Sequence, residues 1–170
     1  LPYKQIAKDV RFAEAKFDWT KETALEWYKT YGDQMMLEFP SKKDAVKVIN
    51  NLHDNGHKIV IATARATDWH TEPERITLEW LKKQNLKYDK IYIGRIDKEK
   101  ICEEENADFF IDDDLKITQR VADFFKDKEN KHSFLSTTDY NKKLPAPEGV
   151  ERILDFKDFA KKVNLYLKKK

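Results

Sequence analysis

A chain of 170 residues suffices for one domain, and its 33 basic and 31 acidic residues leave a net charge of only +2. This balance creates no net field toward nucleic acid or membranes, so we expect neither as a partner. The single cysteine, Cys102, excludes an intramolecular disulfide, and no apolar stretch reaches the about 20 residues of a membrane span. We therefore expect a soluble, cytoplasmic protein.

The first 40 residues contain no strand-like run. Their aromatic-rich text "DWTKETALEWYKTYG" predicts a helix that stops at Gly32, and we interpret residues 1–40 as a small helical cap. Six aromatic residues could stack a nucleotide base if they line this cap, although aromatic residues at helical spacing more often pack in a core. These residues are Trp19, Trp27, Tyr28, Tyr31, Phe39 and Trp69.

From residue 41 onward, helical patterns alternate with short apolar runs. Ser41 and Thr71 are expected to cap two of the helices, and the last helix is expected to begin near Asp155. The apolar runs are continuous rather than alternating, which is typical of parallel strands covered by helices on both faces. They lie at 58–64, 90–94, 107–113, 132–137 and 151–156. Residues 41–170 therefore predict a doubly wound, Rossmann-like α/β sheet.

Polar side chains follow three of these strands. Thr63 ends the first strand, Lys98 and Lys100 follow the second, and Asp112 and Asp113 end "FFIDDD" in the third. The carboxyl ends of parallel strands meet at one edge of a sheet, where ligands bind. A carboxylate pair suits Mg²⁺, while a hydroxyl and an ammonium group suit the oxygens of a phosphate. The sequence thus predicts a magnesium and phosphate site at this edge.

Each of these residues also has a simpler explanation. Asp114 and a neighbour could only cap the following helix, Lys98 could be a solvated lysine, and Thr63 could be an ordinary β-branched strand residue. Cys102 fits a small core residue better than a nucleophile. Their joint position at the strand ends is what favours a site.

The same residues carry a family resemblance. "VIATAR" at 60–65, a lysine opening the helix after "IYIG", and "FFIDDD" resemble motifs II, III and IV of haloacid dehalogenase-like (HAD) phosphatases. The tail "TTDYNKKLPAPEGVERILDFKDF" further resembles the 5'(3')-deoxyribonucleotidases and their bacterial nucleotidase relatives. The resemblance covers roughly residues 40–160 and implies a magnesium-dependent phosphomonoester hydrolase, most like a 5'-nucleotidase acting on (deoxy)nucleoside monophosphates.

The resemblance also implies a role for each matching residue. Thr63 would hydrogen-bond the transferred phosphoryl group, with Ala64 and Arg65 beside it as phosphate or substrate contacts. Lys98 would neutralise the charge of that group, with Lys100 as the fallback. Asp113 would bind Mg²⁺ with Asp112 beside it.

One motif of the family is missing. Motif I, Asp-x-Asp-Gly, supplies the nucleophile and the general acid/base from a strand in the middle of the sheet, between the strands that end in Thr63 and Asp113. The sequence contains no such motif, so we expect no phosphatase turnover from these 170 residues alone. Three explanations stay open: the chain is the C-terminal part of a longer protein, which we favour; the flanking strands have closed up; or another chain supplies the strand.

Two other readings compete with the phosphatase. A catalytically inactive HAD-like protein would still bind phosphate or a nucleotide through the same residues. A receiver-like or flavodoxin-like module would also place acids, Thr and Lys at strand ends. A receiver module needs its acid pair after the first strand, whereas here the pair follows the third strand.

Overall fold

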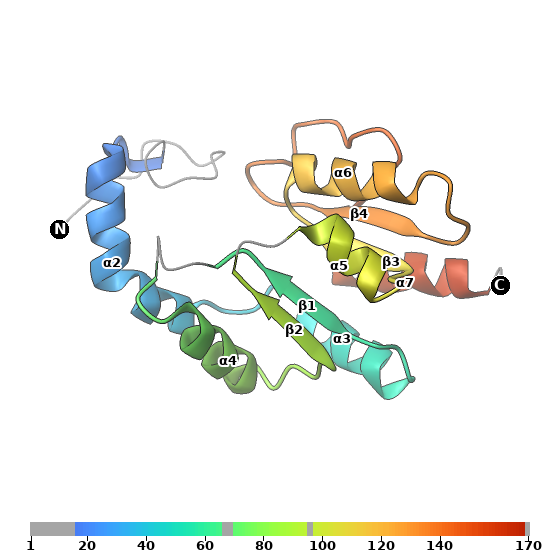
Figure 1. Ribbon diagram of the computed structural model, residues 1–170, viewed down its shortest axis with the longest axis horizontal. Coiled ribbons are helices and arrows are strands. Elements are labelled where there is room, and N and C mark those ends of the chain that lie inside the picture. Colours follow the sequence, from blue (N-terminus) through green and yellow to red (C-terminus); the bar gives the residue numbers. More distant parts are fainter. Residues whose placement is uncertain (1–15, 66–69, 95–96, 169–170) are drawn as a thin grey trace.

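The computed structural model describes residues 16–65, 70–94 and 97–168, which form six α-helices and five β-strands (Figure 1). The helices of this part of the chain are α2 (Lys21–Glu38), α3 (Ala45–Asp54), α4 (Pro73–Lys83), α5 (Lys98–Glu104), α6 (Leu115–Phe125) and α7 (Phe156–Leu167). The strands are β1 (Val60–Thr63), β2 (Lys90–Ile93), β3 (Phe109–Asp112), β4 (His132–Ser136) and β5 (Val150–Ile153).

The strands form two separate sheets. β1 pairs with β2, while β4 lies between β3 and β5, and every pairing is parallel. The predicted α/β class with parallel strands is confirmed, and all five predicted strands occur in the predicted order. A single continuous sheet does not form within the described residues, because β1 and β3 are not hydrogen-bonded to each other. The described residues therefore do not form the smaller closed-up sheet that was one of the three explanations.

Helices cover both faces of the three-stranded sheet. On one face, α3 and α7 bury Leu52, Phe159 and Val163 against Phe134, which is fully buried in β4. On the other face, Cys102 of α5 packs with Val121 and Phe125 of α6, next to Phe110. Successive side chains of a strand point to opposite faces, which explains why a continuous apolar run such as "FFI" serves both layers.

Two helix starts differ from their predictions. α3 begins at Ala45, whose amide donates to the Lys42 carbonyl, so Ser41 is not its cap. α4 begins at Pro73, and neither Thr71 nor Glu72 forms a side-chain cap. Proline is favoured at the first helical position because it lacks the amide that would be unpaired there, and it determines this start without a capping box. The predicted start of α7 is confirmed, since Asp155 accepts a hydrogen bond from the Asp158 amide at 2.8 Å.

The predicted stop at Gly32 is also wrong, because α2 continues to Glu38 with Gly32 buried inside it. An interior glycine costs about 1 kcal/mol relative to alanine. Packing against α4 offsets this cost: the Trp80 indole donates to the Phe39 carbonyl at 2.7 Å, and the Lys83 ammonium donates to the Leu37 carbonyl at 3.1 Å. The division of the chain at residue 40 stays a prediction.

None of the helices in the described ranges combines the length and the apolar character that crossing a membrane requires.

Candidate functional site

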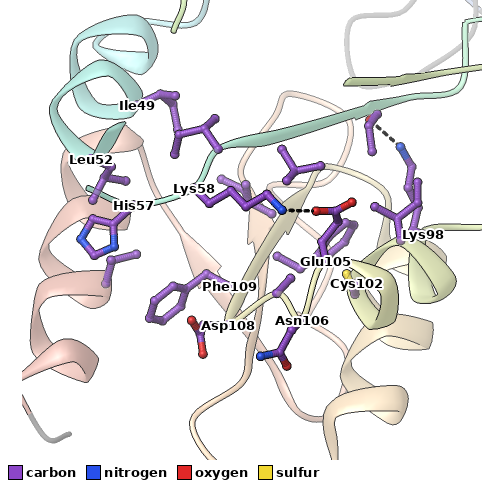
Figure 2. Close-up of a pocket in the computed structure, with 18 of the residues that line it drawn as sticks. Ile49, Leu52, His57, Lys58, Lys98, Cys102, Glu105, Asn106, Asp108 and Phe109 are labelled. Atoms are coloured by element: carbon purple, nitrogen blue, oxygen red, sulfur yellow. Dashed lines mark hydrogen bonds and ion pairs between the residues drawn. The ribbon is translucent and has the colours of Figure 1, made fainter. Parts of the chain in front are cut away.

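A cavity of about 270 Å³ lies between β1 and β3, at the place where the two sheets separate (Figure 2). We call this cavity the slot. Leu52 of α3 and Phe159 of α7 line it from one side, and Ile101 and Cys102 of α5 line it from the other. One water needs about 10–15 Å³, and the volume of the slot is many times larger. The slot is therefore a site large enough for a ligand, with apolar walls in its middle.

Lys98 lies at the carboxyl-terminal end of the slot. It is the first residue of α5, only 3% exposed, and its Nζ donates to the Ala62 carbonyl of β1 at 2.5 Å. Burial lowers the pKa of the Lys98 ammonium, and the nearby Asp112 carboxylate partly opposes that shift. A buried cation with one carbonyl partner is suited to neutralise an anion that enters the same end.

Lys100 is placed differently although it is only two residues further along. Its side chain is 70% exposed, and its Nζ lies 3.8 Å from Glu104 on the same helix. The structure therefore brings Lys98, and not Lys100, to the strand ends.

The three aspartates after β3 have separate positions. Asp114 caps α6, because its Oδ1 accepts hydrogen bonds from the amides of Lys116 at 2.8 Å and Ile117 at 3.0 Å. Asp112, the last residue of β3, is half-buried, and its Oδ1 accepts a hydrogen bond from the Asp114 backbone amide at 2.9 Å. Burial raises the pKa of Asp112, and repulsion by Asp113 adds to the shift. The helix-cap explanation thus holds for Asp114 and leaves its two neighbours for another role.

Asp113 is held in place by its backbone. Its carbonyl accepts hydrogen bonds from the Tyr140 hydroxyl at 2.8 Å and from the side-chain amide of Asn141 at 3.0 Å. No hydrogen bond to the Asp113 carboxylate is found within the part of the chain that the structure describes. The Tyr-Asn pair therefore fixes the loop that presents this carboxylate, a positioning role that the sequence signalled only through the family resemblance.

Thr63 and Ala64 lie at the end of β1, whereas the side chain of Arg65 contacts α4. Thr63 ends β1 half-buried, and its carbonyl pairs with the Gly94 amide at 3.1 Å. Ala64 is exposed. Arg65 donates to the Thr77 hydroxyl of α4 at 3.0 Å and lies 5.9 Å from the Trp80 ring centre. Burial lowers the pKa of the Arg65 guanidinium. The predicted phosphate contact of Arg65 stays a prediction, whereas its contacts in the structure are with α4.

A second lysine reaches the same edge of the sheets and was missed from the sequence. Lys42 Nζ donates to the hydroxyl of Ser136, the last residue of β4, at 2.9 Å. A lysine before a helix gives no sequence signal, because only the fold brings it to the end of a strand 94 residues away.

The carboxylates of Asp112 and Asp113 fit Mg²⁺ only as a pair of ligands that other oxygens complete. Within the described ranges, no group of three or more His, Cys, Asp or Glu side chains is placed to hold a metal. Mg²⁺ commonly takes only one or two carboxylates from a protein and completes its shell with water and phosphate oxygens. Asp112 and Asp113 can supply that pair, and a cation beside them would relieve the repulsion that raises the pKa of Asp112.

Comparison of the chain with protein-family models, with curated proteins and with solved structures finds no match. Any function assigned to the chain must therefore come from its residues and their geometry.

Proposed function

We propose that this chain carries the metal-binding and phosphate-binding part of a magnesium-dependent phosphomonoester hydrolase of the HAD type. The observation that carries the proposal is the buried Lys98 ammonium at the end of the slot, beside Asp112 and close to the end of β1 at Thr63. The substrate class is a nucleoside monophosphate, as the resemblance of the tail implies.

The roles of the residues follow from their chemistry. Phosphoryl transfer requires mainly positioning and charge neutralisation, and both are stronger in a site shielded from water. The Lys98 ammonium would offset the charge of the phosphoryl oxygens, and the Thr63 hydroxyl would donate a hydrogen bond to one of them. Asp112 and Asp113 would hold Mg²⁺, which when bound polarises the phosphoryl group as a Lewis acid. The nucleophile would come from a segment that is not among the 170 residues.

An inactive phosphate-binding or nucleotide-binding protein is the second candidate. It would use the same residues, and it is favoured by the absence of Asp-x-Asp-Gly from the sequence. The two candidates differ only in whether an aspartate nucleophile is brought to the slot.

Calorimetric titration with Mg²⁺ in the presence of inorganic phosphate tests the shared part of both candidates. We expect saturable Mg²⁺ binding that Asp113→Asn abolishes, because the change removes a charge and keeps the shape. Asp114→Asn is the matched control: asparagine remains a good helix cap, and Mg²⁺ affinity should stay within about twofold. Equal loss in both variants, or no effect of Asp113→Asn, would show that the acidic run only caps a helix.

A further inference from the structure

Lys42 lies at the carboxyl edge of the three-stranded sheet, on the segment between α2 and α3. Its Nζ donates to the hydroxyl of Ser136, the last residue of β4, at 2.9 Å. Ser136 is only 7% exposed, so a buried residue holds the ammonium group at this edge. The register of β3 and β4 pairs Asp112 with Leu135, which places Ser136 one step further, level with Asp113. Neighbouring strands are about 5 Å apart, so Lys42 is held close to the acidic run.

One buried side chain fixes Lys42 relative to that acidic run. The side-chain amide of Asn141 donates to the carbonyl of Ser136 at 2.9 Å and to the carbonyl of Asp113 at 3.0 Å. Asn141 is fully buried, and a buried polar network whose members are satisfied holds them rigidly. The anchor of the Lys42 ammonium and the loop that carries the Asp113 carboxylate are therefore tied to the same residue.

The ammonium group of Lys42 has no carboxylate partner among the described residues, although its hydrogen bond spans the fold. Other lysines that reach across the fold are paired with acids, as Lys58 and Lys90 are with Glu105. An ammonium group carries three donors, and the neutral hydroxyl of Ser136 uses one of them without offsetting the charge. Within the described ranges, Lys42 therefore keeps its charge and further donors for an anion at this edge.

Lys98 and Lys42 approach the acidic pair from opposite sides. In β1, the carbonyls of Ile59 and Thr63 accept hydrogen bonds from the β2 side. Alternate residues of a strand face opposite ways, so the Ala62 carbonyl, which holds Lys98, faces the slot. The slot and β3 separate β1 from β4, and this is at least two strand spacings, or roughly 10 Å. A phosphate group that is bound at Lys98 is therefore not the group that Lys42 meets.

We propose that Lys42 binds a second phosphate of the substrate, separated by the sugar from the phosphate at Lys98, so that the preferred ligand is a nucleoside 3',5'-bisphosphate. This inference rests on the proposed function and narrows its substrate class. A nucleoside monophosphate has no group to place against the Lys42 ammonium. A nucleoside diphosphate has its two phosphates adjoining, so the second one stays on the Lys98 side of the acidic pair.

Titration calorimetry of the 170-residue chain with Mg²⁺ tests the proposal with three ligands. These are thymidine 5'-monophosphate, thymidine 5'-diphosphate and thymidine 3',5'-bisphosphate. We expect the bisphosphate to bind at least about tenfold more tightly than the monophosphate, because its additional phosphate forms a charge-assisted hydrogen bond with Lys42. The diphosphate also carries one additional phosphate and so controls for net charge. Equal affinity for the bisphosphate and the diphosphate would contradict the proposal.

Substitution of Lys42 assigns the preference to its ammonium group. In Lys42→Met, the ratio of bisphosphate to monophosphate affinity should fall about tenfold, because the charge and the donors are lost. Lys42→Arg keeps a positive charge and should retain most of the preference. Lys43→Met removes an exposed lysine next to it and should leave the ratio unchanged. An unchanged ratio in Lys42→Met, or the same fall in Lys43→Met, would overturn the proposal.

The same titrations separate this inference from the proposed function. Binding of all three ligands with equal affinity would overturn the second phosphate site alone and leave the site at Lys98 in place. Failure of all three to bind would overturn the proposed function and this inference together. An equal weakening of all three ligands by Lys42→Met would show that the contact with Ser136 only positions the segment before α3, which also contradicts a phosphate contact at Lys42.

Discussion

The boundary between β3 and β4 differs from the boundary between β1 and β3, although similar side chains surround both. Between β3 and β4, the strands pair in parallel from Phe109 to Asp112, and Phe134 is fully buried beside them. Between β1 and β3, apolar residues line a cavity and the backbone edges do not meet. We call these the closed seam and the open seam. Apolar side chains around two strands are therefore not enough to join them in one sheet, because the backbone edges of β1 and β3 also need a strand with which to pair.

The buried polar groups at the carboxyl ends of the two seams differ in how fully they are hydrogen-bonded. Asn141 is fully buried, and its side chain bonds to four groups: it donates to the carbonyls of Asp113 and Ser136, and it accepts from the Thr138 backbone amide and from Arg152. Lys98 is almost as buried but has only one hydrogen-bond acceptor, the Ala62 carbonyl, among the described residues. Buried polar networks that are fully satisfied stabilise a fold, whereas partly satisfied ones are costly unless they serve a function.

The largest difference between the seams should appear when the same side chain is shortened in each. Ile153→Ala beside the closed seam should lower the free energy of unfolding by about 4 kcal/mol, because it opens a new cavity in a packed core. Ile101→Ala in the slot wall should cost only about 2 kcal/mol, because that side chain already borders a cavity. Urea unfolding of both variants measures the difference. Equal costs would mean that the open seam is packed in solution.

Asn141 provides the next test. Asn141→Ala should lower the free energy of unfolding by about 3 kcal/mol, because it leaves several buried groups without partners. Asn164→Ala on the exposed face of α7 is the control and should change stability by less than about 0.5 kcal/mol. Thermal unfolding distinguishes the two, and a small effect at Asn141 would remove the structural role assigned to this polar cluster.

Lys98 should affect ligand binding more than folding. Lys98→Ala should weaken inorganic phosphate binding in the presence of Mg²⁺ about tenfold or more, because hydrogen bonds to charged groups contribute about 1.5–3 kcal/mol. Lys100→Ala should leave that affinity unchanged, since Lys100 is exposed and beside Glu104. Titration calorimetry measures both. Loss in the Lys100 variant alone would move the anion site by two positions.

The smallest expected effect concerns the amino-terminal end of the slot. Glu105 accepts hydrogen bonds from Lys58, Lys90 and Tyr92, each at 2.6 Å, and so links the end of α5 to the sheet of β1 and β2. These bonds, that from Lys58 first, lower the pKa of Glu105 to about 2 from its ordinary 4.5.

Because the folded-state pKa is depressed, the contribution of Glu105 is present above pH 4.5 and is lost as the pH falls toward 2. Glu105→Gln should therefore destabilise the protein at pH 6 and have progressively less effect between pH 4.5 and 2. Glu103→Gln, at an exposed position of α5, is the control for urea unfolding across this range. A Glu105→Gln effect that does not depend on pH would contradict the assigned charge.

Local patterns in the sequence predicted most of the fold. The apolar runs predicted all five strands, and the predicted start of α7 near Asp155 is confirmed. Asp114 caps α6, which was one of the two alternatives for this residue. The failures at Gly32 and Thr71 arose where packing against α4 or a proline outweighed local capping chemistry. At Ser41, a turn closed by the Ala45 amide and the Lys42 carbonyl precedes α3 instead. The contact between Lys42 and Ser136 could not be predicted, because it depends on how segments far apart in the sequence meet.

The candidate site could be predicted only in part for the same reason. The convergence of Lys98 and Asp112 follows from the rule that parallel strand ends share an edge. The sequence could not show that Lys98 bonds to the Ala62 carbonyl or that Arg65 packs on α4, because both depend on side-chain conformations in the folded protein.

The description of the slot depends on the open seam, and amide hydrogen exchange of the free chain tests it most directly. We predict fast exchange at the slot-facing amides of Val60, Ala62, Phe109 and Ile111. Slow exchange should alternate with it at Ile61, Thr63, Phe110 and Asp112, which face β2 or β4. Slow exchange at all eight amides of the free, monomeric chain would show that β1 and β3 pair with each other in solution, and would contradict the account.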